Sequence, residues 1–290
     1  MSAILQTPGA AASGVTQTGR DLVLTDDDFN RLRRMIADRA GIALGAHKRE
    51  MAYSRLARRV RLAGTHRFAD YLAPLEANPA DPEWEHFTNA LTTNLTSFFR
   101  EAHHFPLLAQ HVSQAREPVS VWCCAASTGE EPYSIAITLA EALGQAAERA
   151  KILATDIDTR ALADARAGIY PLAAVEKLSE ERRRRFFLKG SGKRAGLARV
   201  SAELRGRIRF EPVNLAGSDW QVEGPFDAIF CRNLMIYFDK DTQQRVLRGF
   251  ARLLKPNGLL FAGHSENFSY FDNPFVLRGQ TVYQLKANPT

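Results

Sequence analysis

The sequence predicts an α/β protein in which a doubly wound, Rossmann-like domain with a small inserted β-subdomain follows a small all-α domain. Three observations support this prediction. Apolar residues recur at helical spacing up to residue 93, and strand-like runs then alternate with helical segments from Val119 onward. A basic, glycine-rich segment interrupts that alternation after Tyr170. At 290 residues, 45% apolar and 24% charged, the chain is long enough to build two domains.

The amino-terminal part predicts a tail followed by helices. Residues 1–20 are small and polar, and we expect them to be disordered. Thr25 and Asp28 have the spacing of an N-cap with an acidic N3 residue, and the helix that they start should end at Gly41. Further helices are predicted at 48–63, 68–77 and 82–92, and together these helices form a domain over residues 21–93.

The segment 94–106 is predicted to join the two domains. Asn94 and Thr96 make it polar and weakly helical, so it can present amide and hydroxyl groups to a ligand. Arg100 adds a planar cation. Helix capping is the alternative role for the threonines of this segment.

The stretch from Val119 to Ala140 is the predicted centre of the second domain, which spans 107–290. A β-branched, apolar strand leads into a small-residue turn ending at Gly129, and a helix with Pro132 in its first turn follows. In doubly wound folds, such a turn lies beneath an extended ligand at the carboxyl end of the strand. The alternative is an ordinary tight turn, because a lone glycine is not a dinucleotide-binding fingerprint.

The next predicted strand, 151–157, favours the ligand-binding interpretation. It ends in Asp156, at the position where a ribose-binding carboxylate is expected. No P-loop lysine follows Gly129, and Glu130 and Glu131 would repel a pyrophosphate. The expected ligand is therefore a nucleoside without phosphates, and S-adenosylmethionine fits that description.

Two later strands should also present polar groups to this ligand. Strand 208–213 is followed by Asn214, and strand 226–231 by Arg232 and Asn233. The remaining predicted elements are a helix at 241–254, strands at 259–263 and 281–285 that pair as an antiparallel hairpin, and an insertion, about 171–206, with a helix at 178–187 and a small hairpin.

The cysteines and histidines predict no metal site. Cys123, Cys124 and Cys231 lie in strand-like runs without metal-ligand spacing, so buried thiols are expected instead of disulfides or a zinc site. His103 and His104 are adjacent and should point apart on a helix. The chain has no signal-peptide layout and no run of about 18 apolar residues, and we expect it to be cytoplasmic.

The charge indicates an acidic partner. The formal net charge is +6, which would suit nucleic acid, anionic lipid or an acidic protein surface. Arg55, Arg58 and Arg59 share one exposed face of the second helix, with few acids at i+3 or i+4 to neutralise them. They form either a solvated face or a docking surface for an anionic partner.

Several motifs together resemble a known family over essentially the whole chain after Leu24. The sequences TTNLTSFFREAHHFP, AASTGEEPYSIAI, ATDIDTRALADARAGIY, FDAIFCRNLMIYFD and LLKPNGLLFAGHSENF resemble those of the bacterial chemotaxis receptor methyltransferases, the CheR family. The resemblance implies transfer of a methyl group from S-adenosylmethionine to glutamate side chains on the cytoplasmic helices of chemoreceptors. The products would be glutamyl methyl esters and S-adenosylhomocysteine.

The resemblance also implies roles for individual residues. Glu131 would pair with the methionine amino group of the cofactor, Asp156 would bind the ribose, and Tyr237 would lie beside the methyl group. Arg55 and Arg59 resemble the surface that binds the acidic methylation region, which would make the acidic partner a receptor. The full set of implied cofactor contacts is Asn94, Thr96, Arg100, Glu131, Asp156, Asn214, Leu215, Arg232 and Asn233.

The implied reaction requires little catalytic chemistry. A glutamate has an unperturbed pKa of about 4.3 and is already ionised at neutral pH, so no general base is needed. Arg100 or Tyr237 could orient the carboxylate, although Tyr237 could instead pack as a pocket wall. A non-catalytic receptor-binding module and an RNA methyltransferase remain alternatives, but no aromatic-rich basic patch supports RNA. We expect a monomer without nucleic acid or membrane insertion.

The insertion could bind a peptide. Gly190 and Gly192 suit a tight turn whose exposed backbone can accept a strand, with Lys189 and Arg199 nearby for a terminal carboxylate. An ordinary glycine turn is the alternative. The resemblance implies that this turn tethers an aromatic peptide at the receptor's C-terminus, although the best-known members carry arginine where Lys189 lies here.

Overall fold

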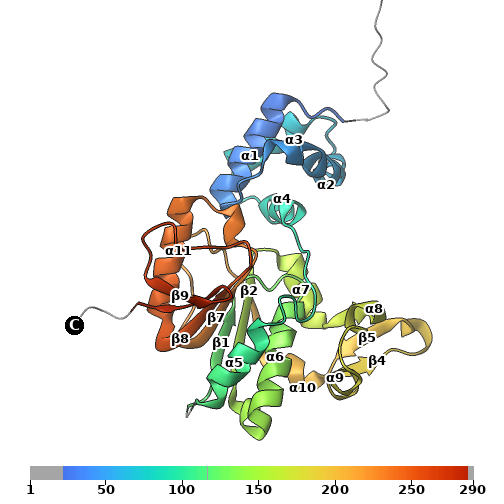
Figure 1. Ribbon diagram of the computed structural model, residues 1–290. Helices are drawn as coiled ribbons and strands as arrows, with labels where there is room; N and C mark the ends of the chain where they lie inside the picture. Colours follow the sequence, from blue (N-terminus) through green and yellow to red (C-terminus); the bar gives the residue numbers. More distant parts are fainter. Residues whose placement is uncertain (1–21, 116, 287–290) are drawn as a thin grey trace, which may run out of the picture.

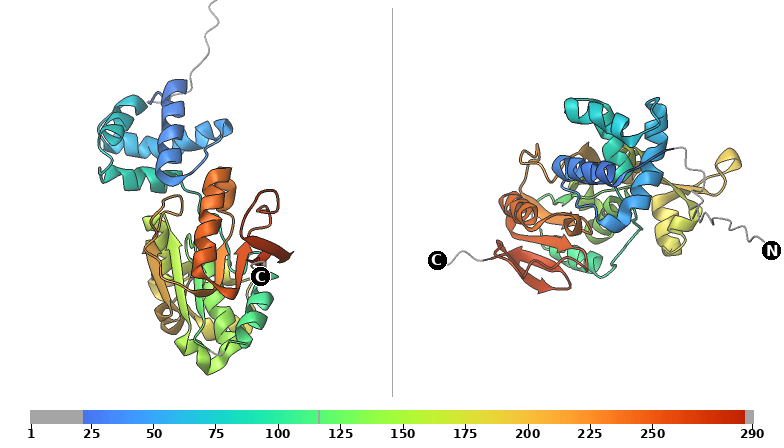
Figure 2. Two further views of the ribbon diagram at one scale, coloured as in Figure 1. Left: turned by 90° about the vertical axis from the view of Figure 1, so that its left-hand side faces the viewer. Right: turned by 90° about the horizontal axis from the view of Figure 1, so that it is seen from above.

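The computed structural model describes residues 22–115 and 117–286. The predicted tail, 1–20, lies outside these residues. Figure 1 shows a helical domain above an α/β domain, with a small β-subdomain to one side. Seen from above in Figure 2, this subdomain projects on the side opposite the carboxyl-terminal strands. No helix within the described ranges is long and apolar enough to cross a membrane.

The helical domain is built as its sequence periodicity predicts. Thr25 and Asp28 form the expected capping box, in which each side chain accepts a hydrogen bond from the other's backbone N–H, and Gly41 ends the helix at a φ of 69°. Leu32, Ile36 and other inward residues share one apolar core. The elements are α1 (Asp26–Ala40), η1 (Ala46–Lys48), α2 (Arg49–Leu62), α3 (Phe68–Ala77) and α4 (Glu83–Leu91).

The α/β domain contains a seven-stranded sheet in the order β6-β2-β1-β7-β8-β10-β9. The first five strands in this order run parallel, and β10 pairs antiparallel with β8, as the predicted hairpin requires. The edge strand β9 lies in a segment for which no strand was predicted. The strands are β1 (Ser120–Cys123), β2 (Lys151–Asp156), β6 (Ile208–Pro212), β7 (Phe226–Cys231), β8 (Leu254–Ala262), β9 (Phe275–Gly279) and β10 (Val282–Leu285).

Alternating residues of the central strands enter two separate cores. Val121 and Cys123 pack with the helices on one face of the sheet, whereas Trp122 and Cys124 pack on the face covered by α11. All three cysteines are free and buried, as expected. The helices of the first face include α5 (His104–Ser113), α6 (Glu130–Leu143) and α7 (Thr159–Ala167), and the second face carries α11 (Lys240–Leu253).

Helix α5 was not predicted, because its first residues belong to the segment that was interpreted as a linker. Phe105, Leu108 and Val112 are buried at spacings of three and four, which is a short helical stripe. This stripe packs against α6 and extends the α/β domain beyond the boundary predicted at 107.

The insertion forms a three-stranded antiparallel sheet, β3-β5-β4, where the sequence predicted a hairpin. The third strand comes from residues just before the insertion, which pair with β5. The hydroxyl of Tyr170 donates to the carbonyl of Thr128 at 2.7 Å and so ties this sheet to the β1–α6 turn. The elements are β3 (Ile169–Pro171), α8 (Leu172–Val175), α9 (Glu180–Phe186), β4 (Phe187–Lys189), η3 (Gly192–Arg194), β5 (Leu197–Val200) and α10 (Ala202–Gly206).

Candidate active site

A pocket lies where the carboxyl ends of the parallel strands meet the helical domain. The strand order reverses between β1 and β7, and such switch points are the usual ligand sites of doubly wound sheets. Ala40 and Ile42 of the helical domain contribute to its wall. The predicted cofactor and catalytic residues all line it: Asn94, Thr96, Arg100, Glu131, Asp156, Asn214, Leu215, Arg232, Asn233 and Tyr237.

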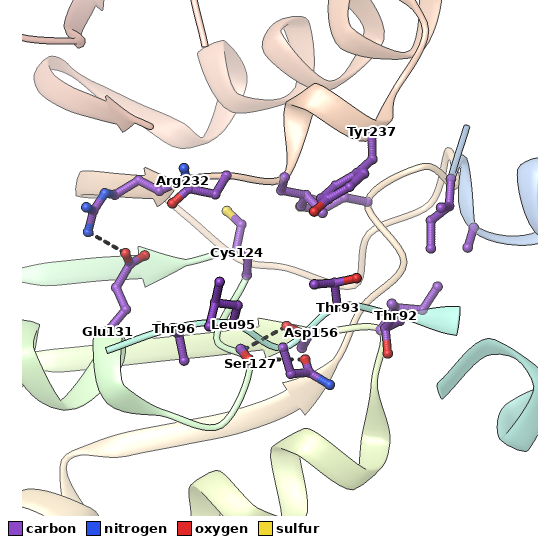
Figure 3. Close-up of a pocket in the computed structure, with 18 of the residues that line it drawn as sticks. Thr92, Thr93, Leu95, Thr96, Cys124, Ser127, Glu131, Asp156, Arg232 and Tyr237 are labelled. Carbon is purple, nitrogen blue, oxygen red and sulfur yellow. Dashed lines mark hydrogen bonds and ion pairs between the residues drawn. The ribbon is translucent and has the colours of Figure 1, made fainter. Parts of the chain in front are cut away.

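Asp156 forms part of the pocket floor at the end of β2 (Figure 3). Its carboxylate accepts hydrogen bonds from the backbone N–H of Ser127 at 2.8 Å and of Asp158 at 2.9 Å. Burial raises the pKa of Asp156 to about 6, although both N–H donors act in the opposite direction. The carboxylate is therefore oriented by the main chain of both the β1–α6 turn and the β2–α7 turn.

Asn94 connects the inter-domain segment to the same floor. Its Nδ2 donates to Asp158 at 2.7 Å, and its Oδ1 accepts from the hydroxyl of Ser127 at 3.1 Å. Asp158 also caps α7 and accepts from the hydroxyl of Thr92. Asp158 was not predicted as a site residue, although an aspartate that directly precedes a helix is a recognisable N-cap signal.

Glu131 and Arg232 form a buried ion pair on the opposite side of the pocket (Figure 3). Arg232 Nη1 lies 2.6 Å from Glu131 Oε2, and Arg232 Nη2 donates to the carbonyl of Arg100. Burial raises the pKa of Glu131, while the Arg232 charge opposes that rise. Arg232 therefore holds the Glu131 carboxylate in place inside the pocket, and its guanidinium does not extend freely into the cavity.

Thr96 and Arg100 come from the inter-domain segment and line the pocket, each half-buried. Arg100 Nη1 donates to the carbonyl of Leu95 at 3.0 Å, which keeps its guanidinium close to its own turn. Leu95 is 80% exposed although it lines the pocket, so an apolar side chain lies at the mouth.

Asn214 and Leu215 follow β6 and close another wall. The Asn214 amide donates to the carbonyl of Arg39 at 2.7 Å, so it connects the two domains. The strand ends were predicted to place amides toward the ligand. The Asn214 amide group instead donates to the backbone of the helical domain. Leu215 is buried and supplies an apolar wall.

Asn233 and Tyr237 lie on the turn after β7, which includes η4 (Met235–Tyr237). Asn233 has a φ of 58°, a left-handed conformation that is uncommon for a residue other than glycine. Tyr237 is half-buried and enters the pocket from the side opposite Asp156 (Figure 3). The buried carboxylate of Glu266, another residue that the sequence analysis missed, binds the backbone of this turn.

The arginines of α2 differ from their predicted role as an uncompensated exposed face. Arg59 forms a two-pronged ion pair with Glu83 of α4, with Nε and Oε1 2.7 Å apart. Arg55 donates to the carbonyl of Thr92. Both are half-buried, and Arg58 is exposed. Only acids along α2 entered the prediction, whereas Glu83, which neutralises Arg59, lies on α4, a helix that packs against α2.

The proposed peptide turn lies on the edge of the three-stranded sheet. Gly190 is needed for packing, because a Cβ there would lie 2.1 Å from the carbonyl oxygen of Arg194. Gly192 has a φ of 57°, and nothing lies within 4 Å of the position of its Cβ. In β5, Arg199 has a buried Nε without a hydrogen-bond partner among the described residues.

His103 and His104 do not point apart as expected, since their ring centroids are 4.3 Å apart. With Glu101 they form a cluster of possible metal ligands. However, His104 Nε2 is engaged with the carbonyl of Gln280, and Arg232 Nη2 lies 3.4 Å from Glu101 Oε2. A cation there would face the Arg232 guanidinium, so we assign no metal.

The arrangement fits S-adenosylmethionine. A main-chain-oriented carboxylate suits the two hydroxyls of a ribose, and Ile157, Val213 and Leu215 offer apolar surface for a purine. Glu131 supplies negative charge at the other end of the pocket, where an ammonium group would be stabilised. The β1–α6 turn lacks the lysine of a phosphate-binding loop.

Comparison with known proteins agrees with this geometry. The family model "CheR methyltransferase, SAM binding domain" matches residues 94–284, and "CheR methyltransferase, all-alpha domain" matches residues 27–92. A chemotaxis protein methyltransferase of Klebsiella aerogenes is 57% identical over 284 residues, which cover 97% of this chain and 98% of that protein. Proteins of the same description from Salmonella typhimurium and Escherichia coli are 55% and 54% identical, each over 97% of this chain and 98% of the relative. The chain therefore belongs to the CheR methyltransferase family, and its cofactor is S-adenosylmethionine.

Proposed function

We propose that this methyltransferase acts on glutamate side chains in the cytoplasmic domain of chemoreceptors and forms glutamyl methyl esters. The observation that carries the proposal is the convergence of ten separately predicted residues on one pocket between the two domains. The relatives' description as chemotaxis protein methyltransferases supports a receptor as the methyl acceptor.

In this proposal, different pocket residues bind different parts of the cofactor. Asp156 accepts from the ribose hydroxyls, and Glu131 stabilises the methionine ammonium group while Arg232 holds it in place. Leu215 and its apolar neighbours bind the adenine. The list of proposed cofactor contacts is Asn94, Thr96, Arg100, Glu131, Asp156, Asn214, Leu215, Arg232 and Asn233.

Bound S-adenosylmethionine supplies a sulfonium-activated methyl group. The acceptor carboxylate is ionised at neutral pH and needs no base from the protein, because an unperturbed glutamate has a pKa of about 4.3. The protein's task is therefore to desolvate and orient that carboxylate. Tyr237 enters the pocket (Figure 3) and Arg100 lines it, so a phenolic hydroxyl and a guanidinium can both donate to the incoming oxygen atoms.

Two surfaces are proposed to meet the receptor. On α2, Arg55 contributes positive charge beside the inter-domain segment, Arg58 extends it into solvent, and Arg59 would add its charge on exchanging Glu83 for a receptor acid. On the three-stranded sheet, Gly190, Gly192 and Arg199 would bind a C-terminal peptide, and such tethering would raise the local concentration of methylation sites. Arg199 has a buried donor without a partner in the described chain, which a peptide oxygen could satisfy.

The test is transfer of labelled methyl groups from S-adenosylmethionine into membranes that contain chemoreceptors. A glutamyl methyl ester releases its label in mild alkali, whereas a methylated amine or nucleic-acid base does not. We expect alkali-labile incorporation into the receptor. Incorporation that survives alkali, or that appears in RNA added to the same reaction, would overturn the assignment of the acceptor.

A further inference from the structure

Glu266 is a buried carboxylate with an unusual set of partners. It lies between β8 and β9 and is only 3% exposed. Oε1 accepts from the backbone N–H of Leu234 at 2.9 Å and of Met235 at 2.7 Å, and Oε2 accepts from Asn233 N–H at 2.9 Å and Gly263 N–H at 2.5 Å. Four main-chain donors thus compensate its burial, and no cation pairs with it among the described residues.

Three of these four donors belong to consecutive residues of the turn after β7. Their N–H groups can converge on one carboxylate only because Asn233 adopts the left-handed conformation, at a φ of 58°. That conformation costs about 1 kcal/mol or more for a residue other than glycine and needs compensation from its surroundings. Gly263 permits the close approach, since a Cβ there would lie 2.5 Å from Asn233 Nδ2.

The carbonyl groups of the same turn are held from other directions. Gln243 Nε2 donates to the carbonyls of Met235 at 2.9 Å and Phe238 at 3.1 Å. The backbone N–H of Ala43, in the helical domain, donates to the carbonyl of Tyr237 at 2.9 Å. The main chain around Tyr237 is therefore held by three separate segments, while its ring enters the pocket (Figure 3).

We propose that Glu266 is a positioning residue for methyl transfer, acting through Asn233 and Tyr237 without touching the reacting atoms. This inference rests on the proposed function of Tyr237 at the methyl-transfer site. Displacement of such a group by about 1 Å can cost up to about a hundredfold in rate, because attack on a methyl group is governed by alignment. Glu266 sets the alignment by holding the turn at its N–H groups, and Gln243 holds it at its carbonyls.

The test compares Glu266→Gln with Asp227→Asn. Glutamine has nearly the same size as glutamate, but its amide nitrogen cannot accept a hydrogen bond. Two of the four backbone N–H groups would therefore lose their acceptor. Asp227 is also buried and also accepts a backbone N–H, that of Ser120 at 2.8 Å, but it lies at the opposite end of β7. Its substitution controls for the general cost of removing a buried carboxylate.

We expect Glu266→Gln to lower kcat about tenfold, with a smaller rise in KM for the cofactor because Asn233 also lines the cofactor pocket, and with little change in KM for the receptor. Asp227→Asn should lower Tm comparably and leave kcat unchanged. Hydrogen exchange should show lost protection at Leu234 and Met235 in Glu266→Gln alone. The half-buried Gln243→Ala offers a milder variant, for which we expect a fall in kcat of about threefold.

An equal kcat in Glu266→Gln and Asp227→Asn at comparable Tm would overturn the inference, and so would a change confined to KM. Parallel assays of the wild-type protein on receptor membranes separate the two proposals. If the wild type is inactive there, the proposed function fails. If the wild type is active and both Glu266→Gln and Gln243→Ala match it, only the positioning role fails.

Discussion

The pocket and the helical domain satisfy their charged groups in different ways. Around the pocket, Asp156, Asp158 and Glu266 each accept from backbone N–H groups, whereas Glu131 pairs with a cation, Arg232. In the helical domain, the charges meet as side-chain pairs, such as Arg31 with Glu76 and Arg59 with Glu83. An acid held by the main chain is placed by the fold itself, whereas two long side chains can separate and find other partners.

This difference has consequences for function. Pocket carboxylates held by the main chain cannot be moved without moving the turns that bear the other pocket residues. The Arg59–Glu83 pair is partly exposed, with about a quarter of each side chain accessible, so an acidic receptor surface could compete for Arg59. The pocket therefore fixes the positions of its carboxylates, whereas charged side chains on the surface of the helical domain can exchange partners. Substitutions in the two regions should differ in size and in salt dependence.

The largest effect is expected for Asp156→Ala. The ribose would lose a charged acceptor, and Ser127 and Asp158 would lose the acceptor of their N–H groups. The loss should be about 3 kcal/mol, or about a hundredfold in affinity for S-adenosylmethionine. Calorimetry on the purified variant, with circular dichroism to confirm folding, measures it. Wild-type affinity in a folded variant would show that the floor carboxylate does not bind the ribose.

The second prediction is a pH dependence of cofactor binding. The pKa of Asp156 is raised to about 6 by burial, so the carboxylate is mostly ionised at pH 7 and mostly protonated at pH 5. A ribose that needs the ionised form should bind about tenfold more weakly at pH 5 than at pH 7. The dependence should disappear in Asp156→Asn, where no proton binds. A similar slope in that variant would assign the titration to another group.

The sequence predicted the pocket better than the surfaces, for physical reasons. Helix α3 and strand β7 match their predicted bounds, because periodicity and strand-end chemistry are local signals. Parallel strands bring their carboxyl ends to one edge, so Asp156 and Asn233 could be placed together without a structure. The role of Glu266 could not be predicted in this way, because the N–H groups that bind its carboxylate lie about thirty residues earlier in the chain. The partner of Arg59 was missed for the same reason.

The third prediction separates docking from folding on α2. Arg59→Glu would break the pair with Glu83 and set two carboxylates against each other, so the helical domain should lose about 1 kcal/mol of unfolding free energy. The double substitution Arg58→Glu with Arg61→Glu changes the net charge by the same amount as replacing both Arg55 and Arg59 with glutamate. Unlike Arg55 and Arg59, these two side chains are exposed. The Arg58 and Arg61 pair is therefore the cleaner test of docking.

For Arg58→Glu with Arg61→Glu, we expect unchanged Tm and cofactor affinity, and about fivefold slower receptor methylation at low salt. The difference should shrink as salt is raised, because screening weakens long-range attraction. Methylation rates across a salt series measure it. If the double variant matches the wild type at low salt, the exposed arginines of α2 form only a solvated face.

The smallest effect is expected at the turn of the three-stranded sheet. Gly192 has a left-handed φ of 57° and open space around its Cβ position, so valine would meet no clash but would strain the backbone. The turn should relax away from the shape that accepts a strand, and a C-terminal receptor peptide should bind about threefold more weakly. Gly279→Val is the matched control, because Gly279 also has a positive φ of 117° and open space, but is the last residue of β9. Fluorescence titration with a labelled peptide should show weakening only in Gly192→Val, with unchanged cofactor affinity in both variants. Equal peptide binding by wild type and Gly192→Val would mean that Lys189 and Arg199 lie beside an ordinary turn, and that the enzyme meets its receptor through α2 and the pocket alone.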